Sequence, residues 1–432
     1  MLMVADASRV AGGVAVSEEP VQLPPMTLTL NGVVTAVVEQ NPDVLLYKER
    51  IAAAESQVQT QFGTLLPNLA SNVRQTRQTQ FLGTFGLPPV RTDPFSIFDA
   101  RVNASQNLLS VSLIQRWRAS RHNLQVVEFE AESRKYDAMA SVALLYMEGL
   151  KAQAMVTRHE VNQRVVADLL SLVKQRQRGG LATGLDILRL EAQLANEKQL
   201  AASSRYDVAH AKLNLLNMLS LPYETPMTLA DEFRIDVDVA ASSHDAVKEA
   251  LANRPEVHSQ VTRVKAMELT YSSITGERLP SLIAQGDYGL IGNRWNNTID
   301  TYNMMLLLQV PIFDGAQREG RIAEARSQLR QEALRLRSVL NQVKMEVHDA
   351  LASLASAKEQ VAIAQAGMRS ATKELELARE RYAFLTTENH FELTNALSAV
   401  SLAGENLVNA LFQLNAAWVN YARATGTLNS LN

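Results

Sequence analysis

The sequence is internally duplicated, and this feature constrains the fold more than any other. Asn41-Pro42-Asp43-Val44 recurs as Arg254-Pro255-Glu256-Val257, an offset of 213 residues. Further along, an offset of 204 aligns residues of the same type: Leu181 with Leu385, Thr183 with Thr387, and Ala192 with Ala396. The difference falls near Gly86-Leu87-Pro88-Pro89, and a loop tip tolerates an insertion. Matches in the same order over about 180 residues predict two structurally equivalent halves.

Each half is predicted to contain the same elements in the same order. The first is a helix that ends at a Leu-Pro dipeptide, because proline removes a hydrogen-bond donor and clashes with the preceding turn. Two short extended segments, a very long helix, a tight turn and a return helix follow. The predicted helices are 30–65, 110–178 and 185–219 in the first half, and 242–278, 316–384 and 391–425 in the second.

The repeat also sets the predicted domain boundaries. They are an N-terminal extension at 1–27, which we expect to be disordered, a first repeat at 28–221, a linker at 222–241, a second repeat at 242–426, and a C-terminal tail at 427–432. In the linker, the alternating residues from Phe233 to Val239 predict one short strand.

The long helices carry apolar residues every seven positions, with alanines between them. One such series is Val347, Leu354, Val361, Met368 and Leu375, a second is Leu393, Val400, Leu407, Leu414 and Tyr421, and a looser one is Leu188, Ala192, Ala195, Ala202, Tyr206, Ala209, Leu213 and Leu216. Sustained heptads predict coiled-coil packing, and the short turns make the paired helices antiparallel. About 69 residues at ~1.5 Å each give a helix on the order of 100 Å. Such a helix is a spacer, a fibre element or the wall of a tube.

Four segments alternate between apolar and polar residues. The apolar positions are Leu69 and Val73; Ala100, Val102 and Ala104; Leu282, Ala284, Gly286, Tyr288 and Leu290; and Tyr302, Met304, Leu306 and Leu308. Period two predicts strands with unlike faces. Segments of roughly 9–11 residues suit a tilted strand that crosses a bilayer. A soluble antiparallel sheet over a core has the same local pattern.

The position of the strands favours a membrane barrel. Both predicted hairpins interrupt long helices at equivalent points, and the sequence predicts no second sheet for them to join. Four strands are too few to close a barrel, since about eight is the minimum, so their edges must pair with other copies of the chain. Two copies would give a filled barrel of eight strands, whereas three give twelve strands and leave room for a channel.

Composition excludes several classes of protein. A formal net charge of −3 argues against a nucleic-acid-binding protein. Without cysteine there is no disulfide, thiolate zinc site or lipidated N-terminal cysteine. No phosphate-binding loop, nucleophile elbow or His-Glu-x-x-His motif occurs. We therefore predict no enzyme, no catalytic residue, no cofactor and no metal site.

The N-terminal residues show no secretory signal. The first 26 residues contain no seven-residue apolar stretch behind a basic start. The numbering then begins after a removed signal, or the protein is not exported, and both alternatives stay open. No apolar run approaches the ~20 residues that a membrane-spanning helix needs.

The sequence resembles the TolC-like outer membrane efflux proteins, the exit ducts of Gram-negative tripartite efflux pumps and type I secretion systems. The resemblance rests on the duplication, the Leu-Pro before each hairpin, Pro311-Ile312-Phe313-Asp314-Gly315, and the segment 185–194 after the first turn. It covers roughly residues 28–426. The missing cysteine does not support the lipid-anchored branch of the family.

The resemblance implies a mainly α fold with a small β part. Duplicated long-helix coiled-coil hairpins and four β-strands per protomer would form a homotrimer with a 12-stranded barrel in the outer membrane and an α-helical tunnel in the periplasm. It implies a passive conduit for small molecules or proteins. The implied partners are a periplasmic adaptor (membrane fusion) protein, an inner-membrane pump and outer membrane lipid. The alternatives are a soluble structural coiled-coil scaffold and, less favoured because the chain is duplicated, a periplasmic adaptor.

The resemblance also implies functional positions at the periplasmic tip. The family narrows its tunnel with acidic residues spaced i, i+3, and alignment on Ala396 places Glu392 and Asn395 there. A ring of three Glu392 carboxylates would repel anions, although a solvated or capping role for Glu392 fits equally well. The residues implied to dock the adaptor are Gly180, Leu181, Ala182, Thr183, Leu385, Thr386 and Thr387.

Overall fold

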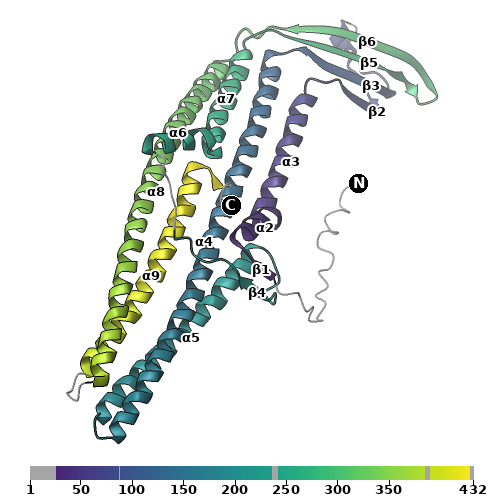
Figure 1. The fold of residues 1–432 in the computed structure, drawn as a ribbon. Coiled ribbons are helices and arrows are strands. Elements are labelled where there is room, and N and C mark those ends of the chain that lie inside the picture. The colour runs from purple at the N-terminus through teal and green to yellow at the C-terminus, as the bar shows by residue number, and fades with distance from the viewer. Residues whose placement is uncertain (1–25, 87, 236–241, 385–389, 429–432) are drawn as a thin grey trace.

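The computed structural model describes residues 26–86, 88–235, 242–384 and 390–428. The first half contains β1 (Met26–Leu28), α2 (Leu30–Gln40), α3 (Pro42–Gly63), β2 (Asn68–Gln78), the short 3-10 helix η1 (Leu82–Phe85), β3 (Phe95–Leu109), α4 (Val111–Arg178) and α5 (Gly184–Met218). The second half contains β4 (Met227–Leu229), α6 (Ser243–Asn253), α7 (Pro255–Gly276), β5 (Ser281–Arg294), β6 (Asn297–Gln309), α8 (Gln317–Phe384) and α9 (His390–Thr425). The helices form an elongated bundle, and the sheet extends sideways from one end of it (Figure 1).

The long and return helices lie close to their predicted bounds, but the predicted helices 30–65 and 242–278 are wrong as single helices. Each is two helices, broken before Pro42 and before Pro255. The residue that precedes a proline is pushed into extended conformation, and both Asn41 and Arg254 adopt it. The Asn41 side chain then caps α3 by accepting from the amide of Asp43 at 2.9 Å.

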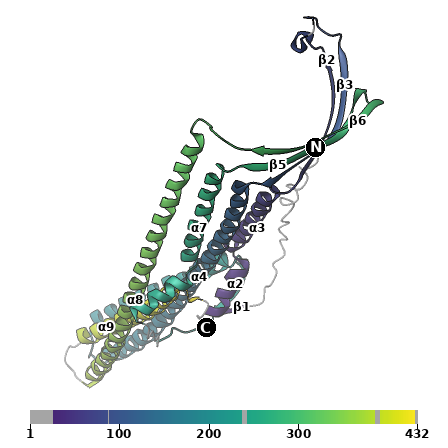
Figure 2. The same cartoon turned by 90° about the horizontal axis from the view of Figure 1, so that it is seen from above.

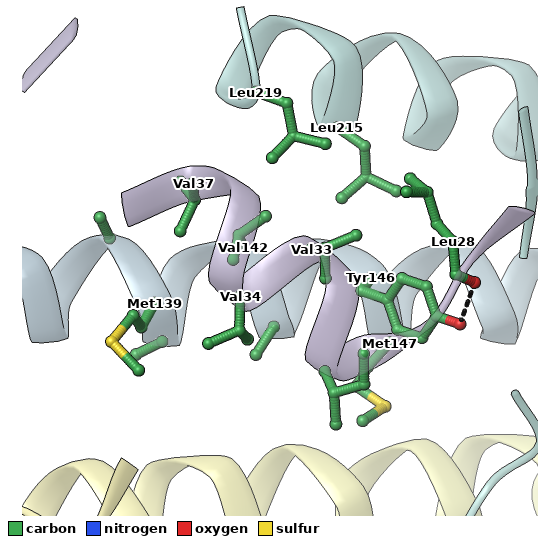
Figure 3. Close-up of a cluster of buried hydrophobic side chains, with 14 of the residues drawn as sticks. Leu28, Val33, Val34, Val37, Met139, Val142, Tyr146, Met147, Leu215 and Leu219 are labelled. Carbon is green, nitrogen blue, oxygen red and sulfur yellow. Dashed lines mark hydrogen bonds between the residues drawn. The ribbon is translucent and has the colours of Figure 1, made fainter. Parts of the chain in front are cut away.

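The helices pack as antiparallel hairpins, α4 with α5 and α8 with α9 (Figure 1). On α8 the predicted heptad is buried within the protomer, with Val347, Leu354 and Val361 in one core cluster. A second cluster lies where α2 crosses α4 and α5 (Figure 3). The cluster includes Tyr146, a fully buried side chain whose hydroxyl lies 3.0 Å from the carbonyl oxygen of Leu28.

The four predicted transmembrane segments form one antiparallel sheet in the order β2-β3-β5-β6. The two predicted hairpins are joined through β3 and β5, so that Val102 lies opposite Tyr288, which in turn lies opposite Tyr302. The strands curve along their length as they leave the helices (Figure 2). Strands β2 and β6 are the two edges of this sheet.

The linker strand is not where the sequence predicts it. Residues 231–235 form no strand, and 236–239 lie outside the described residues. The backbone amide of Arg234 donates to the Asn415 side chain at 3.1 Å and not to a neighbouring strand. The strand of this linker is instead β4, which pairs in parallel with β1. The N-terminal extension at 1–27 is predicted to be disordered, but its last two residues belong to β1. Residues 1–25 lie outside the described part.

Candidate functional site

Among the described residues, one face of the sheet is apolar and uncovered. Alternation along the strands places Val102, Tyr288 and Tyr302 in one row on this face, with Met304 and Leu306 on the next two rows of β6. Met304 is 85% exposed. A contiguous apolar surface of this kind marks contact with another protein or with lipid.

The opposite face is largely polar. On β3 it carries Asp99, Arg101 and Asn103, and the Arg101 guanidinium lies 2.7 Å from carboxylate oxygens of both Asp99 and Asp287. The polarity is incomplete, because Met305 and Leu307 of β6 share this face by alternation. The sheet thus has the unlike faces that the sequence predicts, and its edge strands β2 and β6 present main-chain groups that no strand of the described protomer pairs.

The end of the α4–α5 hairpin, far from the sheet, holds the first group of predicted docking residues. Gly180 has a left-handed backbone (φ +75°), which closes the turn, and Leu181 is exposed. Thr183 caps α5 in a reciprocal capping box with Asp186. Ala182 packs partly against the apolar cluster below the turn. The corresponding residues Leu385, Thr386 and Thr387 lie outside the described residues.

The predicted gate residue Glu392 lies in the first turn of α9. Its carboxylate accepts a hydrogen bond from the Arg381 guanidinium of α8 at 2.6 Å, and both side chains are substantially exposed. Asn395 is exposed one turn further on. The sequence prediction missed Arg381, which lies eleven positions before Glu392 and gives its charge a partner within the protomer.

A buried polar cluster, which the sequence prediction also missed, joins the two helical hairpins. Glu197 of α5 is almost fully buried and lies 3.0 Å from Nδ1 of His159 on α4. Its other oxygen accepts from the hydroxyl of Ser401 on α9 at 2.9 Å. Asn162 of α4 donates to the same hydroxyl at 3.0 Å. Glu197 and Ser401 are equivalent positions under the 204-residue offset, a signal that was present in the sequence.

Arg158 extends this cluster toward α9. Its guanidinium donates to the carbonyl oxygen of Val400 at 2.7 Å and lies against Gly404, where any side chain would collide with it. Burial lowers the pKa of Arg158, and the nearby Glu197 and Glu405 carboxylates oppose this effect. The cluster therefore fixes how α9 sits on α4.

Most of the looser heptad of α5 has no partner among the described residues of the protomer, although its last member, Leu216, is buried in the core. Leu188, Tyr206 and Leu213 are exposed, Tyr206 by 68%. The buried face of the helix is a different one, with Leu190, Glu197 and Ala211. A heptad face without a partner indicates an interface with another chain. We call the exposed residues Leu185, Leu188, Ala192, Ala195, Ala202, Tyr206, Ala209 and Leu213 the α5 stripe.

In the part of the chain that the structure describes, no three His, Asp or Glu side chains gather as a metal site. Within the same residues, no helix combines the length and the apolarity that a membrane span requires.

Residues 246–427 match the outer membrane efflux protein family. The second half of the chain therefore resembles this family. Its members are outer membrane channels for efflux and not enzymes, as the sequence predicts. Among curated relatives, the pyoverdine export outer membrane protein OpmQ of Pseudomonas putida is 23% identical over 243 residues, which cover 55% of this chain and 52% of OpmQ. The chain thus spans about half the length of this relative.

Several solved structures have the same fold as this chain. A membrane protein from Pseudomonas aeruginosa has a TM-score of 0.83 at 18% identity, with 92% of this chain and 93% of that one covered. VceC from Vibrio cholerae has a TM-score of 0.82 at 16% identity, covering 92% and 96%. The open-state MtrE channel of Neisseria gonorrhoeae has a TM-score of 0.79 at 16% identity, covering 92% and 89%.

Proposed function

We propose that three copies of this outer membrane efflux protein form a passive exit duct that spans the outer membrane and continues as a helical tunnel through the periplasm. The observation that carries the proposal is the sheet, which in the described part of the chain has one uncovered apolar face and two unpaired edges. Lipid would cover the apolar face, and neighbouring copies would pair β6 with β2. Three copies give twelve strands, enough for an open lumen.

The α5 stripe supports this assembly. Its heptad spacing suits a coiled-coil contact with a helix of the next copy, which would cover Leu188 and Tyr206. Leu188→Asp together with Leu213→Asp should shift the detergent-extracted particle from trimer to monomer, as measured by native mass. Lys198→Asp, an exposed change on the flank of the same helix, should leave the trimer intact. Stripe variants that remain trimeric would place the interface elsewhere.

Conduction tests the duct itself. The purified protein should produce discrete channels in planar lipid bilayers, because the proposed lumen is water-filled. A monomeric particle that gives no channels would contradict the proposal. Full solubility without detergent would instead support the soluble coiled-coil scaffold, although the exposed apolar sheet face favours the duct.

The proposed partners are a periplasmic adaptor protein and an inner-membrane pump that supplies the energy. The exposed turn from Gly180 to Thr183 is the proposed docking surface, together with 385–387. OpmQ is named for the export of pyoverdine, a relationship that supports a small-molecule cargo over a protein. A photo-crosslinking amino acid at Leu181 should capture the adaptor, whereas one at Met304 should not.

The proposed gate consists of Glu392 and Asn395, with the Arg381 pair as an added component. Glu392→Ala removes one negative charge per protomer and leaves Arg381 without this partner, so the cation preference of the channel should fall. Glu376→Ala breaks a similarly exposed pair with Lys373 and is the control. Unchanged ion selectivity in the Glu392 variant would contradict the gate assignment.

A further inference from the structure

Four charged side chains gather on the polar face of the sheet, across three strands. Arg74 of β2 lies opposite Asp99 of β3, and Arg101 and Asp287 follow on the next two rows. Directly opposite Arg101 is Gly289, where an added Cβ would lie 2.3 Å from the Cβ of Arg101. Only glycine at this position lets Arg101 lie across the sheet between its two carboxylate partners. We call Arg74, Asp99, Arg101 and Asp287 the charge belt.

The positive and negative members of the charge belt differ in exposure. The side chains of Asp99 and Asp287 are only 14% and 18% exposed, and each binds Arg101 at 2.7 Å. The side chain of Arg74 is 74% exposed, and its nearest carboxylate atom, on Asp99, is 3.6 Å away, beyond a strong hydrogen bond. The two carboxylates are therefore largely buried and are bound by Arg101, whereas the guanidinium of Arg74 is exposed to water and has donors available for another group.

We propose that the charge belt is an anion-recognition site of the lumen, in which Arg74 binds carboxylate or other oxyanion groups of small-molecule cargo. The inference rests on the proposed function, because it takes the polar face of the sheet as the lumen wall. Guanidinium presents paired donors that match oxyanions in geometry and charge. Asp99, Arg101 and Asp287 together carry one net negative charge, and Arg74 balances it. Removing the charge of Arg74 should therefore make the charge belt negative, and removing the charge of Asp287 should make it positive.

Ion selectivity in planar bilayers tests this assignment. Arg74→Gln leaves the belt with a net charge of −1 per protomer and should lower the chloride-to-potassium permeability ratio by about two-fold or more. Asp287→Asn gives a net charge of +1 and should raise the ratio. Arg77→Gln is the matched control, since Arg77 lies on the same strand but, by alternation, on the apolar face, and it should change nothing.

Block of the current by citrate, a small tricarboxylate, tests binding directly. The concentration that halves the wild-type current should rise by roughly ten-fold in Arg74→Gln, because a charge-assisted contact is lost. Arg74 is exposed, so this variant tests the site even if Asp287→Asn fails to fold. Channels of Arg74→Gln with wild-type selectivity and citrate block, or equal shifts in Arg77→Gln, would overturn the belt and leave the duct standing. Absence of wild-type channels would overturn both.

Discussion

Removal of the buried Glu197 carboxylate should destabilise the helical bundle strongly. The Glu197→Ala variant loses two close contacts, to His159 at 3.0 Å and to Ser401 at 2.9 Å, and leaves these polar groups buried. Two hydrogen bonds to a charged group contribute roughly 3–6 kcal/mol. At about 2 °C per kcal/mol for a large helical unit, the midpoint of thermal unfolding should fall on the order of 6–12 °C.

Circular dichroism of the detergent-extracted protein can measure this shift in parallel with a control. Glu191→Ala is the matched variant, because Glu191 lies on the same helix and pairs with Lys174 at 2.8 Å, yet both side chains are nearly half exposed. A surface pair contributes about 0–1 kcal/mol, so its midpoint should move by no more than about 2 °C. A Glu197→Ala shift no larger than that of Glu191→Ala would refute the idea that this cluster holds the two hairpins together.

Three other predictions follow from the packing. Ser401→Glu would place a second carboxylate against Glu197, its equivalent in the other half, and should prevent stable assembly as judged by native mass, whereas Ser401→Ala should only lower the unfolding midpoint. Burial, the largest cause, raises the pKa of Tyr146 above its ordinary value of 10.0. The contribution of Tyr146 to stability is thus complete below pH 10 and lost as the pH rises further, and Tyr146→Phe should remove this alkaline loss from unfolding curves. Burial alone would raise the pKa of Glu346, but the hydrogen bond and charge of Arg254 outweigh it and hold the pKa below the ordinary value of 4.5. The contribution of the Glu346–Arg254 pair to stability is therefore complete above pH 4.5 and is lost as the pH falls further. Glu346→Gln should reduce this loss of stability in acid.

Local signals in the sequence located most elements of the fold. The heptads of the second half and the turns between helices predicted α8 and α9. Hydrophobic periodicity and helix-breaking residues are local signals, which can be read within one segment of the chain. The same reasoning fails at Asn41-Pro42 and Arg254-Pro255, where the repeat predicts one continuous helix and the structure has two. It failed also in the described part of the linker, where residues 233–235 form no strand and the backbone amide of Arg234 donates to Asn415.

The candidate sites depended more on tertiary structure. The position of Glu392 came from the family resemblance, but its pairing with Arg381 depends on how two antiparallel helices are aligned at the tip. The charge belt likewise requires the register of β2, β3 and β5, which alternation alone does not specify. Sequence spacing gives the face of an element and not the residue opposite it.

The sequence by itself determined the duplicated order of helices and strands and the two faces of the sheet, because repeats and periodicity are properties of the chain. Only the tertiary structure decided which faces are buried within one protomer. The heptad of α8 is covered by its own chain, whereas the more loosely periodic α5 stripe is exposed and Glu197 occupies the buried side of that helix. A hydrophobic period shows that a face needs a partner, and only packing in three dimensions shows whether the same chain supplies it.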